Sequence, residues 1–157
     1  MEAFNTYKVC LIASSGGHIE ELMQLEILRK KYRYFFMVPK TKWTSDLDGK
    51  KYFIHDMDRK NKILKIISLV RIFLEQIPVF IKEYPDVIVT TGAVVAIPIC
   101  IYAKLFKKKV IFIESIARVY TPSKTGKILG KIADLFLVQW EEQLKCYSNA
   151  TYGGWIY

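Results

Sequence analysis

The fold is decided by residues 7–18, YKVCLIASSGGH. Residues 7–13 are a short run of β-forming residues that stops at a Ser-Ser-Gly-Gly turn. From His18 to Lys31, apolar residues recur at the spacing of a helix that packs one face on a core. Strand, glycine turn and helix in this order predict the first unit of an α/β domain.

The same alternation continues along the chain. Five further segments have the composition of strands: 33–38, 51–54, 86–90, 109–113 and 134–138. Helices are predicted at 61–82, with a kink at Pro78, and at 93–106 and 123–133, while 40–50 reads as a polar loop. We therefore expect a Rossmann-like doubly wound parallel sheet, in which ligands collect beyond the carboxyl ends of the strands.

Length and composition predict a single domain over residues 1–157, because 157 residues, 52% of them apolar, suffice for one core. Residues 87–103 are uncharged, but they are shorter than the roughly 20 residues that cross a bilayer and are interrupted by Gly92 and Pro98. The three cysteines lack metal or disulfide spacing, and the first residues lack the pattern of a signal peptide. We expect a cytoplasmic protein with no metal and no cofactor.

The net charge of +9 favours an anionic partner. The basic residues form three clusters: Arg29, Lys30, Lys31 and Arg33; Arg59, Lys60, Lys62 and Lys65; Lys104, Lys107, Lys108 and Lys109. The second cluster opens the strongly apolar segment 61–82, a pattern typical of a helix that lies on a membrane surface. No nucleic-acid-binding motif is present, so we expect no nucleic acid partner.

The corner Ser14, Ser15, Gly16, Gly17 and His18 places small residues at a helix N-terminus, where a phosphate or carboxylate is favoured. A glycine turn that only allows a tight corner is an equally favoured interpretation. An imidazole at position 18 could act as a general base or donate to a diphosphate.

Two later strands also end in polar residues. Thr90, Thr91 and Gly92 form a second strand-to-helix corner, for which a simple helix cap is the alternative. Glu114 directly follows a strand, and Arg118 lies four residues on. This carboxylate is a candidate base or sugar ligand, and a surface ion pair with Arg118 is the alternative.

The last predicted strand is followed by Gln139, Trp140 and Glu141. Core packing is the first interpretation of Trp140, and contact of these residues with a sugar or a partner is the second.

Several segments together resemble the Alg14-like oligosaccharide biosynthesis family: SSGGH (14–18), TTGAVVAIP (90–98), IESIARVYTPSKTGKIL (113–129), ADLFLVQWEE (133–142) and GGWIY (153–157). In length the chain is most similar to bacterial PssD/EpsE-type subunits of two-chain capsule and exopolysaccharide glycosyltransferases. One departure is Ala117, where many relatives carry an acid before the arginine.

The resemblance implies the acceptor-side half of a split GT-B enzyme, similar to the N-terminal half of MurG and peripheral on the inner face of the cell membrane. A separate subunit would bind the nucleotide-sugar, such as a UDP-sugar. Gly16, Gly17 and His18 would then face the diphosphate of a polyprenyl-linked acceptor, Thr91 and Gly92 would form a second wall, and Glu114 would activate or orient the acceptor hydroxyl.

Two other functions stay open from the residues. A nucleotide-binding Rossmann module of another enzyme would need an acid after its second strand, where this chain has Pro39 and Lys40. A membrane scaffold that only recruits a partner would tolerate the loss of His18 and Glu114.

Overall fold

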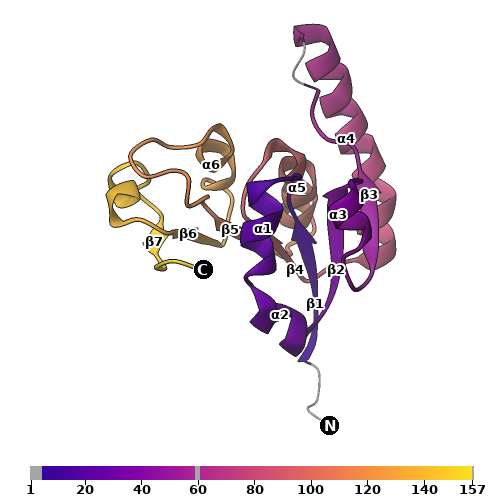
Figure 1. The fold of residues 1–157 in the computed structure, drawn as a ribbon, viewed down its shortest axis with the longest axis horizontal. Helices are drawn as coiled ribbons and strands as arrows, with labels where there is room; N and C mark the ends of the chain where they lie inside the picture. Colours follow the sequence, from indigo (N-terminus) through magenta and orange to yellow (C-terminus); the bar gives the residue numbers. More distant parts are fainter. Residues whose placement is uncertain (1–4, 59–60, 157) are drawn as a thin grey trace.

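The computed structural model describes residues 5–58 and 61–156, which build one parallel sheet covered by helices on both faces (Figure 1). Its strand order is β3-β2-β1-β4-β5-β6-β7, and every neighbouring pair is parallel. The strands are β1 (Asn5–Ile12), β2 (Tyr32–Pro39), β3 (Lys51–Ile54), β4 (Val87–Thr90), β5 (Lys109–Ile113), β6 (Leu135–Val138) and β7 (Thr151–Tyr152). All predicted strands are confirmed, and the short β7 is added at the edge.

The described helices are α1 (Gly17–Met23), α2 (Glu26–Lys31), α3 (Lys42–Ser45), α4 (Lys62–Glu83), α5 (Ile97–Leu105) and α6 (Lys124–Leu129), with 3₁₀ turns η1 (Val94–Ala96) and η2 (Glu141–Lys145). The strand order reverses between β1 and β4, which is the switch point where such sheets bind ligands. The predicted doubly wound fold is therefore confirmed.

Four helical predictions need correction. The single helix expected at 18–31 is two helices, because Leu25 leaves the helical region with ψ at 48°. The helix expected at 123–133 ends at Leu129. The loop expected at 40–50 contains α3, which Thr41 caps. The helix expected at 93–106 begins as η1, and Pro98 stands in the first turn of α5, where its missing N–H costs nothing.

The core consists of two apolar layers, one on each face of the sheet. On one face, Ile19 and Leu22 of α1 pack with Leu11 of β1. On the other face, α4, α5 and α6 cover the sheet, and Ile72 and Phe80 of α4 belong to that layer. Burial on both faces explains the nearly continuous apolar strands.

Helix α4 touches the core with only part of its length. Its buried residues are Ile72, Gln76, Phe80 and Glu83, and no residue of 62–71 is buried. Figure 1 shows the start of α4 rising beyond the sheet. The helix continues through Pro78. Among the residues that the structure describes, no helix is both long and apolar enough to cross a bilayer.

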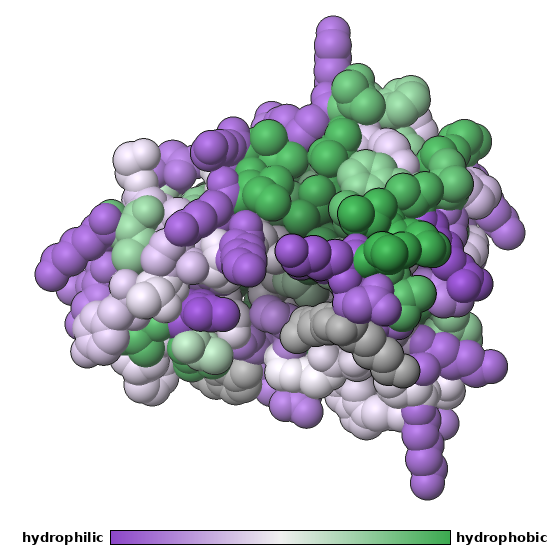
Figure 2. Space-filling view, turned by 90° about the horizontal axis from the view of Figure 1, so that it is seen from above, coloured by the Kyte–Doolittle hydropathy of each residue, from purple (hydrophilic) through white to green (hydrophobic). Residues whose placement is uncertain are grey.

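An apolar stripe runs along the outer side of α4. Its members are exposed and follow one another at helical spacing: Ile63, Ile67, Val70, Leu74, Ile77 and Ile81. Figure 2, seen from above, shows a broad hydrophobic area bordered by hydrophilic side chains. Lys62, Lys65 and Arg71 are exposed on the same helix, while Arg59 and Lys60 of the predicted basic cluster lie outside the described residues.

A buried carboxylate joins the C-terminal end of α4 to the sheet. Glu83 forms ion pairs with Lys8 at 3.3 Å and Lys50 at 2.5 Å, and Tyr52 donates a hydrogen bond to it. Burial acts to raise the pKa of Glu83, but the three donors outweigh it and lower the pKa to about 2. The folded state therefore favours the ionised carboxylate.

Because of this network, the free energy of unfolding should depend on pH. In the unfolded chain a glutamate has a pKa of about 4.3, so the lowered pKa of the folded state adds up to about 3 kcal/mol to the free energy of unfolding. The contribution is complete above about pH 5 and is lost as the pH falls towards 2. Urea unfolding at pH 6 and pH 3 should show a smaller loss for Glu83→Gln than for the wild type. The exposed control Glu20→Gln should keep the wild-type loss; equal losses in all three proteins would contradict the assignment.

Candidate functional site

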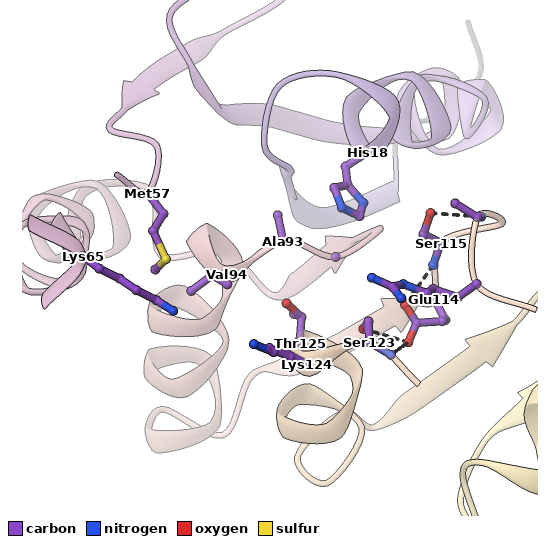
Figure 3. Close-up of a pocket in the computed structure, with 13 residues that line it drawn as sticks. His18, Met57, Lys65, Ala93, Val94, Glu114, Ser115, Ser123, Lys124 and Thr125 are labelled. Atoms are coloured by element: carbon purple, nitrogen blue, oxygen red, sulfur yellow. Dashed lines mark hydrogen bonds between the residues drawn. The ribbon is translucent and has the colours of Figure 1, made fainter. Parts of the chain in front are cut away.

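A pocket of about 510 Å³ opens at the carboxyl edge of the sheet (Figure 3). It lies beyond β1, β4 and β5, around the point where the strand order reverses. Its lining comprises His18, Met57, Lys65, Gly92, Ala93, Val94, Glu114, Ser115, Ala117, Arg118, Ser123, Lys124 and Thr125. Four residues predicted from the strand ends, His18, Gly92, Glu114 and Arg118, thus border one pocket.

His18 is held in place by the corner after β4. The Thr91 hydroxyl donates to the backbone carbonyl of His18, and the Nδ1 atom of His18 lies 3.0 Å from the carbonyl oxygen of Thr91. Because a carbonyl oxygen only accepts, this contact requires a proton on Nδ1. The lone pair of the neutral ring is then on Nε2, the nitrogen that a general base uses in this tautomer.

Gly92 is required beside His18 for two reasons. Its φ is 115°, a region that side-chain-bearing residues avoid, and a Cβ there would lie 3.1 Å from His18 Cε1. The Thr90 hydroxyl bonds both the N–H and the carbonyl of Gly92 at 3.1 Å. Thr90 and Thr91 are buried and shape this corner from within.

The glycine corner after β1 is open. Gly16 has a φ of 84°, and a Cβ at Gly16 or Gly17 would meet no atom within 4 Å. Ser14 is buried, whereas Ser15 is exposed and its hydroxyl lies 3.4 Å from an Asp56 carboxylate oxygen. These four residues do not line the pocket, so their anion-binding role stays a prediction.

Glu114 is buried, and both of its oxygens accept hydrogen bonds. Oε1 accepts from Ser115 N at 3.1 Å, and Oε2 accepts from Ser123 Oγ at 2.9 Å, from Ser123 N at 3.3 Å and from the Tyr147 hydroxyl. Burial and the Glu114 carboxylate raise the pKa of Tyr147, so its phenol keeps its proton. Glu114 is thus bonded to these interior groups and not, as one alternative held, to Arg118.

The pocket also contains basic residues that the strand-end rule did not predict. Lys65 comes from the overhanging start of α4, and Lys124 comes from the first turn of α6, just after the helix cap Ser123. Lys65 has an ambiguous sequence signal, because a lysine in a basic cluster is usually solvated, and Lys124 belongs to none of the three basic clusters. With Arg118 they place three cations on three different segments around one cavity.

Gln139, Trp140 and Glu141 lie outside the pocket lining. Gln139 is buried, donating to the Glu114 carbonyl at 3.0 Å and accepting from Ile156 N at 3.2 Å. Trp140 is half-buried and donates to the Ile116 carbonyl at 2.8 Å, and Glu141 is exposed. Gln139 therefore connects interior groups of the chain, and contact of Gln139, Trp140 and Glu141 with a sugar or a partner stays a prediction.

Metal binding has no candidate in residues 5–58 and 61–156, where no three His, Cys, Asp or Glu side chains group closely enough to hold an ion. Among the described residues that line the pocket, the ionisable groups are the imidazole of His18, the three cationic side chains and the Glu114 carboxylate, beside the hydroxyls of Ser115, Ser123 and Thr125.

The fold and the pocket together define a Rossmann-like α/β domain with its ligand site at the switch point. Solved structures share this fold: MurG from Acinetobacter baumannii has a TM-score of 0.71 at 16% identity, over 87% of this chain and 42% of that one. UDP-N-acetylglucosamine 2-epimerase from Rickettsia bellii has a TM-score of 0.70 at 16% identity, over 97% and 46%. The chain thus spans less than half the length of either structure.

The family is shown by sequence. The family model described as "Oligosaccharide biosynthesis protein Alg14 like" matches residues 9–156, so the chain belongs to the Alg14-like family. One relative, the UDP-N-acetylglucosamine transferase subunit ALG14 of Mus musculus, is 26% identical over 95% of this chain and 82% of its own length.

Proposed function

We propose that this chain is the acceptor-binding, membrane-contacting subunit of a bipartite inverting glycosyltransferase. Its substrate would be a polyprenyl-diphosphate-linked saccharide, and a separate subunit would supply the nucleotide-sugar site, as in the PssD/EpsE-type enzymes of capsule and exopolysaccharide synthesis. The observation that carries this proposal is the cationic pocket at the switch point, bordered by His18.

The charge of the pocket fits a diphosphate. Lys65, Arg118 and Lys124 line it. Among the described lining residues the one carboxylate is Glu114, which accepts four hydrogen bonds from Ser115, Ser123 and Tyr147. Arginine and lysine are the side chains that most often bind phosphate groups. A volume of about 510 Å³ is within the usual range of small-molecule sites and suits a diphosphate with the sugar next to it.

His18 is our candidate for the general base. In the proposed reaction the acceptor hydroxyl gives its proton to Nε2 of His18 while its oxygen bonds to the anomeric carbon of the donor. The bond from that carbon to the nucleoside diphosphate breaks in the same step, which inverts the anomeric configuration. The contact of Nδ1 with Thr91 supports this role, since it fixes the tautomer in which Nε2 carries the lone pair.

UDP-N-acetylglucosamine is the first donor to test. Two relatives, from mouse and human, match over 95% and 94% of this chain, and both are named as UDP-N-acetylglucosamine transferase subunits. We propose a UDP-sugar of this kind as the donor bound by the partner subunit.

The position of α4 supports a membrane role. Lys65 lines the pocket, and the apolar stripe defined above begins at Ile63 on the same turns of α4. An anionic lipid surface fits a stripe of aliphatic side chains flanked by Lys62, Lys65 and Arg71. Lying there, α4 would bring the pocket to the level of the lipid headgroups, where the diphosphate of a polyprenyl lipid is found.

Membrane binding should depend on this stripe. Replacing Ile67, Val70 and Leu74 by Ser should weaken binding to anionic vesicles by about tenfold or more in a flotation assay, because each exposed side chain would otherwise enter the apolar interface. Phe73, another apolar residue of α4, is left unchanged in this variant because its ring packs edge-on against Tyr102. The control is Ile27→Ser, an exposed residue of α2; undiminished binding of the folded triple variant would exclude the stripe as the contact.

The proposed function is tested by reconstitution. The purified chain should transfer no sugar by itself and should become active when its genomic neighbour encoding a donor-binding subunit is added, with vesicles that carry a polyprenyl-diphosphate saccharide. Robust transfer by the isolated chain would contradict the bipartite assignment. Normal transfer after loss of both His18 and Glu114 would instead support a scaffold.

A further inference from the structure

Glu21 is a buried acid that the proposed reaction does not use. It lies on α1 three residues after His18, and it is 2% exposed. Its Oε1 accepts from Ser115 Oγ at 2.7 Å and from Ile116 N at 3.2 Å, while its Oε2 is buried without a hydrogen-bond partner in the described part of the chain. Burying a carboxylate with one unbonded oxygen costs folding free energy, so Glu21 is not explained by a gain in stability. What it does to the geometry of the neighbouring segments is the better guide to its role.

The contacts of Glu21 fix the turn that follows β5. Arg118 N donates to Ser115 O at 3.0 Å and closes this turn over residues 115–118. The three preceding N–H groups all point to acceptors inside the protein: that of Ser115 to Glu114, that of Ile116 to Glu21 and that of Ala117 to Ser115 Oγ at 3.3 Å. Hydrogen bonds to two buried carboxylates, Glu114 and Glu21, therefore set the shape of the turn.

The same turn carries residues of the pocket. Ser115, Ala117 and Arg118 all line the cavity, and Figure 3 shows Ser115 beside Glu114, across from the His18 ring. Helix α1 presents His18 and also bears Glu21. A single side chain thus links the segment that holds the candidate base to the segment that holds a candidate diphosphate ligand.

We propose that Glu21 is a positioning residue for the acceptor, which ties α1 to the 115–118 turn and so sets the placement of Arg118 relative to His18. The proposal rests on the proposed function for its substrate. Glu21 itself does not line the pocket. The pKa of Glu21 is raised, because the effect of burial outweighs that of the hydrogen bonds from Ser115 and Ile116, which lower it. A neutral amide at this position is accordingly a close substitute, because its oxygen still accepts from both groups.

The kinetic test compares three variants in the reconstituted complex. Glu21→Ala should raise the KM for the acceptor about tenfold, as expected when the buried hydrogen bonds to Ser115 and Ile116 are lost, with the KM for the nucleotide-sugar unchanged. Glu21→Gln should recover most of this loss. Glu20→Gln, the exposed neighbour with the same change of charge, should behave as wild type. A wild-type acceptor KM in Glu21→Ala would overturn the proposal.

A second measurement is independent of activity. In the purified chain, Glu21→Ala should speed amide hydrogen exchange at Ile116 and Ala117 about tenfold and leave β1 and β4 unchanged. Uniformly faster exchange would indicate general destabilisation and would overturn the positioning role. If Glu21→Ala fails to fold, Ser115→Ala removes the other hydrogen bond that holds Glu21 and should speed exchange at Ile116, whose N–H donates to Glu21. An inactive wild-type complex would contradict the proposed function, while exchange at 116 and 117 would still decide whether Glu21 fixes the turn.

Discussion

Replacing His18 by Asn should lower the turnover of the assembled two-chain enzyme by about 10²- to 10⁴-fold, the usual contribution of a general base. An asparagine side chain places an N–H near the position of Nδ1, so it can still donate to the Thr91 carbonyl that holds the histidine. It has no atom at the position of Nε2. The variant therefore removes the proton acceptor and keeps the contact that shapes the corner.

The matched control for this substitution is the second histidine of the chain. His55 is exposed and pairs with Glu75 at 2.6 Å, and it does not line the pocket. His55→Asn should leave turnover unchanged. Initial rates at saturating acceptor and donor measure both variants, with the melting temperature as a check on folding. Turnover of folded His18→Asn within a few fold of wild type would remove His18 from the role of base.

The position of the pocket could be predicted from the sequence because parallel strands end at one edge of a sheet. Residues that directly follow β1, β4 and β5 had to come close together once the doubly wound order was assumed. His18, Gly92, Glu114 and Arg118 do border one cavity. Local pattern and topology together were sufficient for these four.

Other features of the site depend on packing that no local pattern encodes. Glu20 and Glu21 are adjacent acids on one short helix, yet the first is exposed and the second is buried against the 115–118 turn. The sequence places Lys65 only in a predicted membrane-surface helix, whereas the overhang of α4 brings it to the pocket. The break between α1 and α2 at Leu25 could not be predicted, because apolar residues keep their helical spacing across it.

The hydrogen bonds of Glu114 change what its substitution is expected to do. Four hydrogen bonds already reach this carboxylate: Oε2 accepts from Ser123 N, Ser123 Oγ and the Tyr147 hydroxyl, and Oε1 accepts from Ser115 N. Such a group is better suited to hold Ser123 and the first turn of α6 at the pocket wall than to take a proton from the acceptor. Our proposal therefore keeps its orienting role and gives the base role to His18.

Glu114→Gln should lower turnover of the complex by about 10- to 100-fold, because the amide turns a donor towards one of the groups that Glu114 now accepts from. Tyr147→Phe removes one donor to Glu114 from outside the pocket lining and should cause a smaller loss in the same direction. If Glu114 were the base, the two variants would diverge: Tyr147→Phe would free a lone pair and keep turnover, while Glu114→Gln would lose about 10²- to 10⁴-fold together with the acid limb of the pH–rate profile. Parallel losses with that limb retained support the orienting role, and normal turnover in Glu114→Gln would leave Glu114 with a purely structural one.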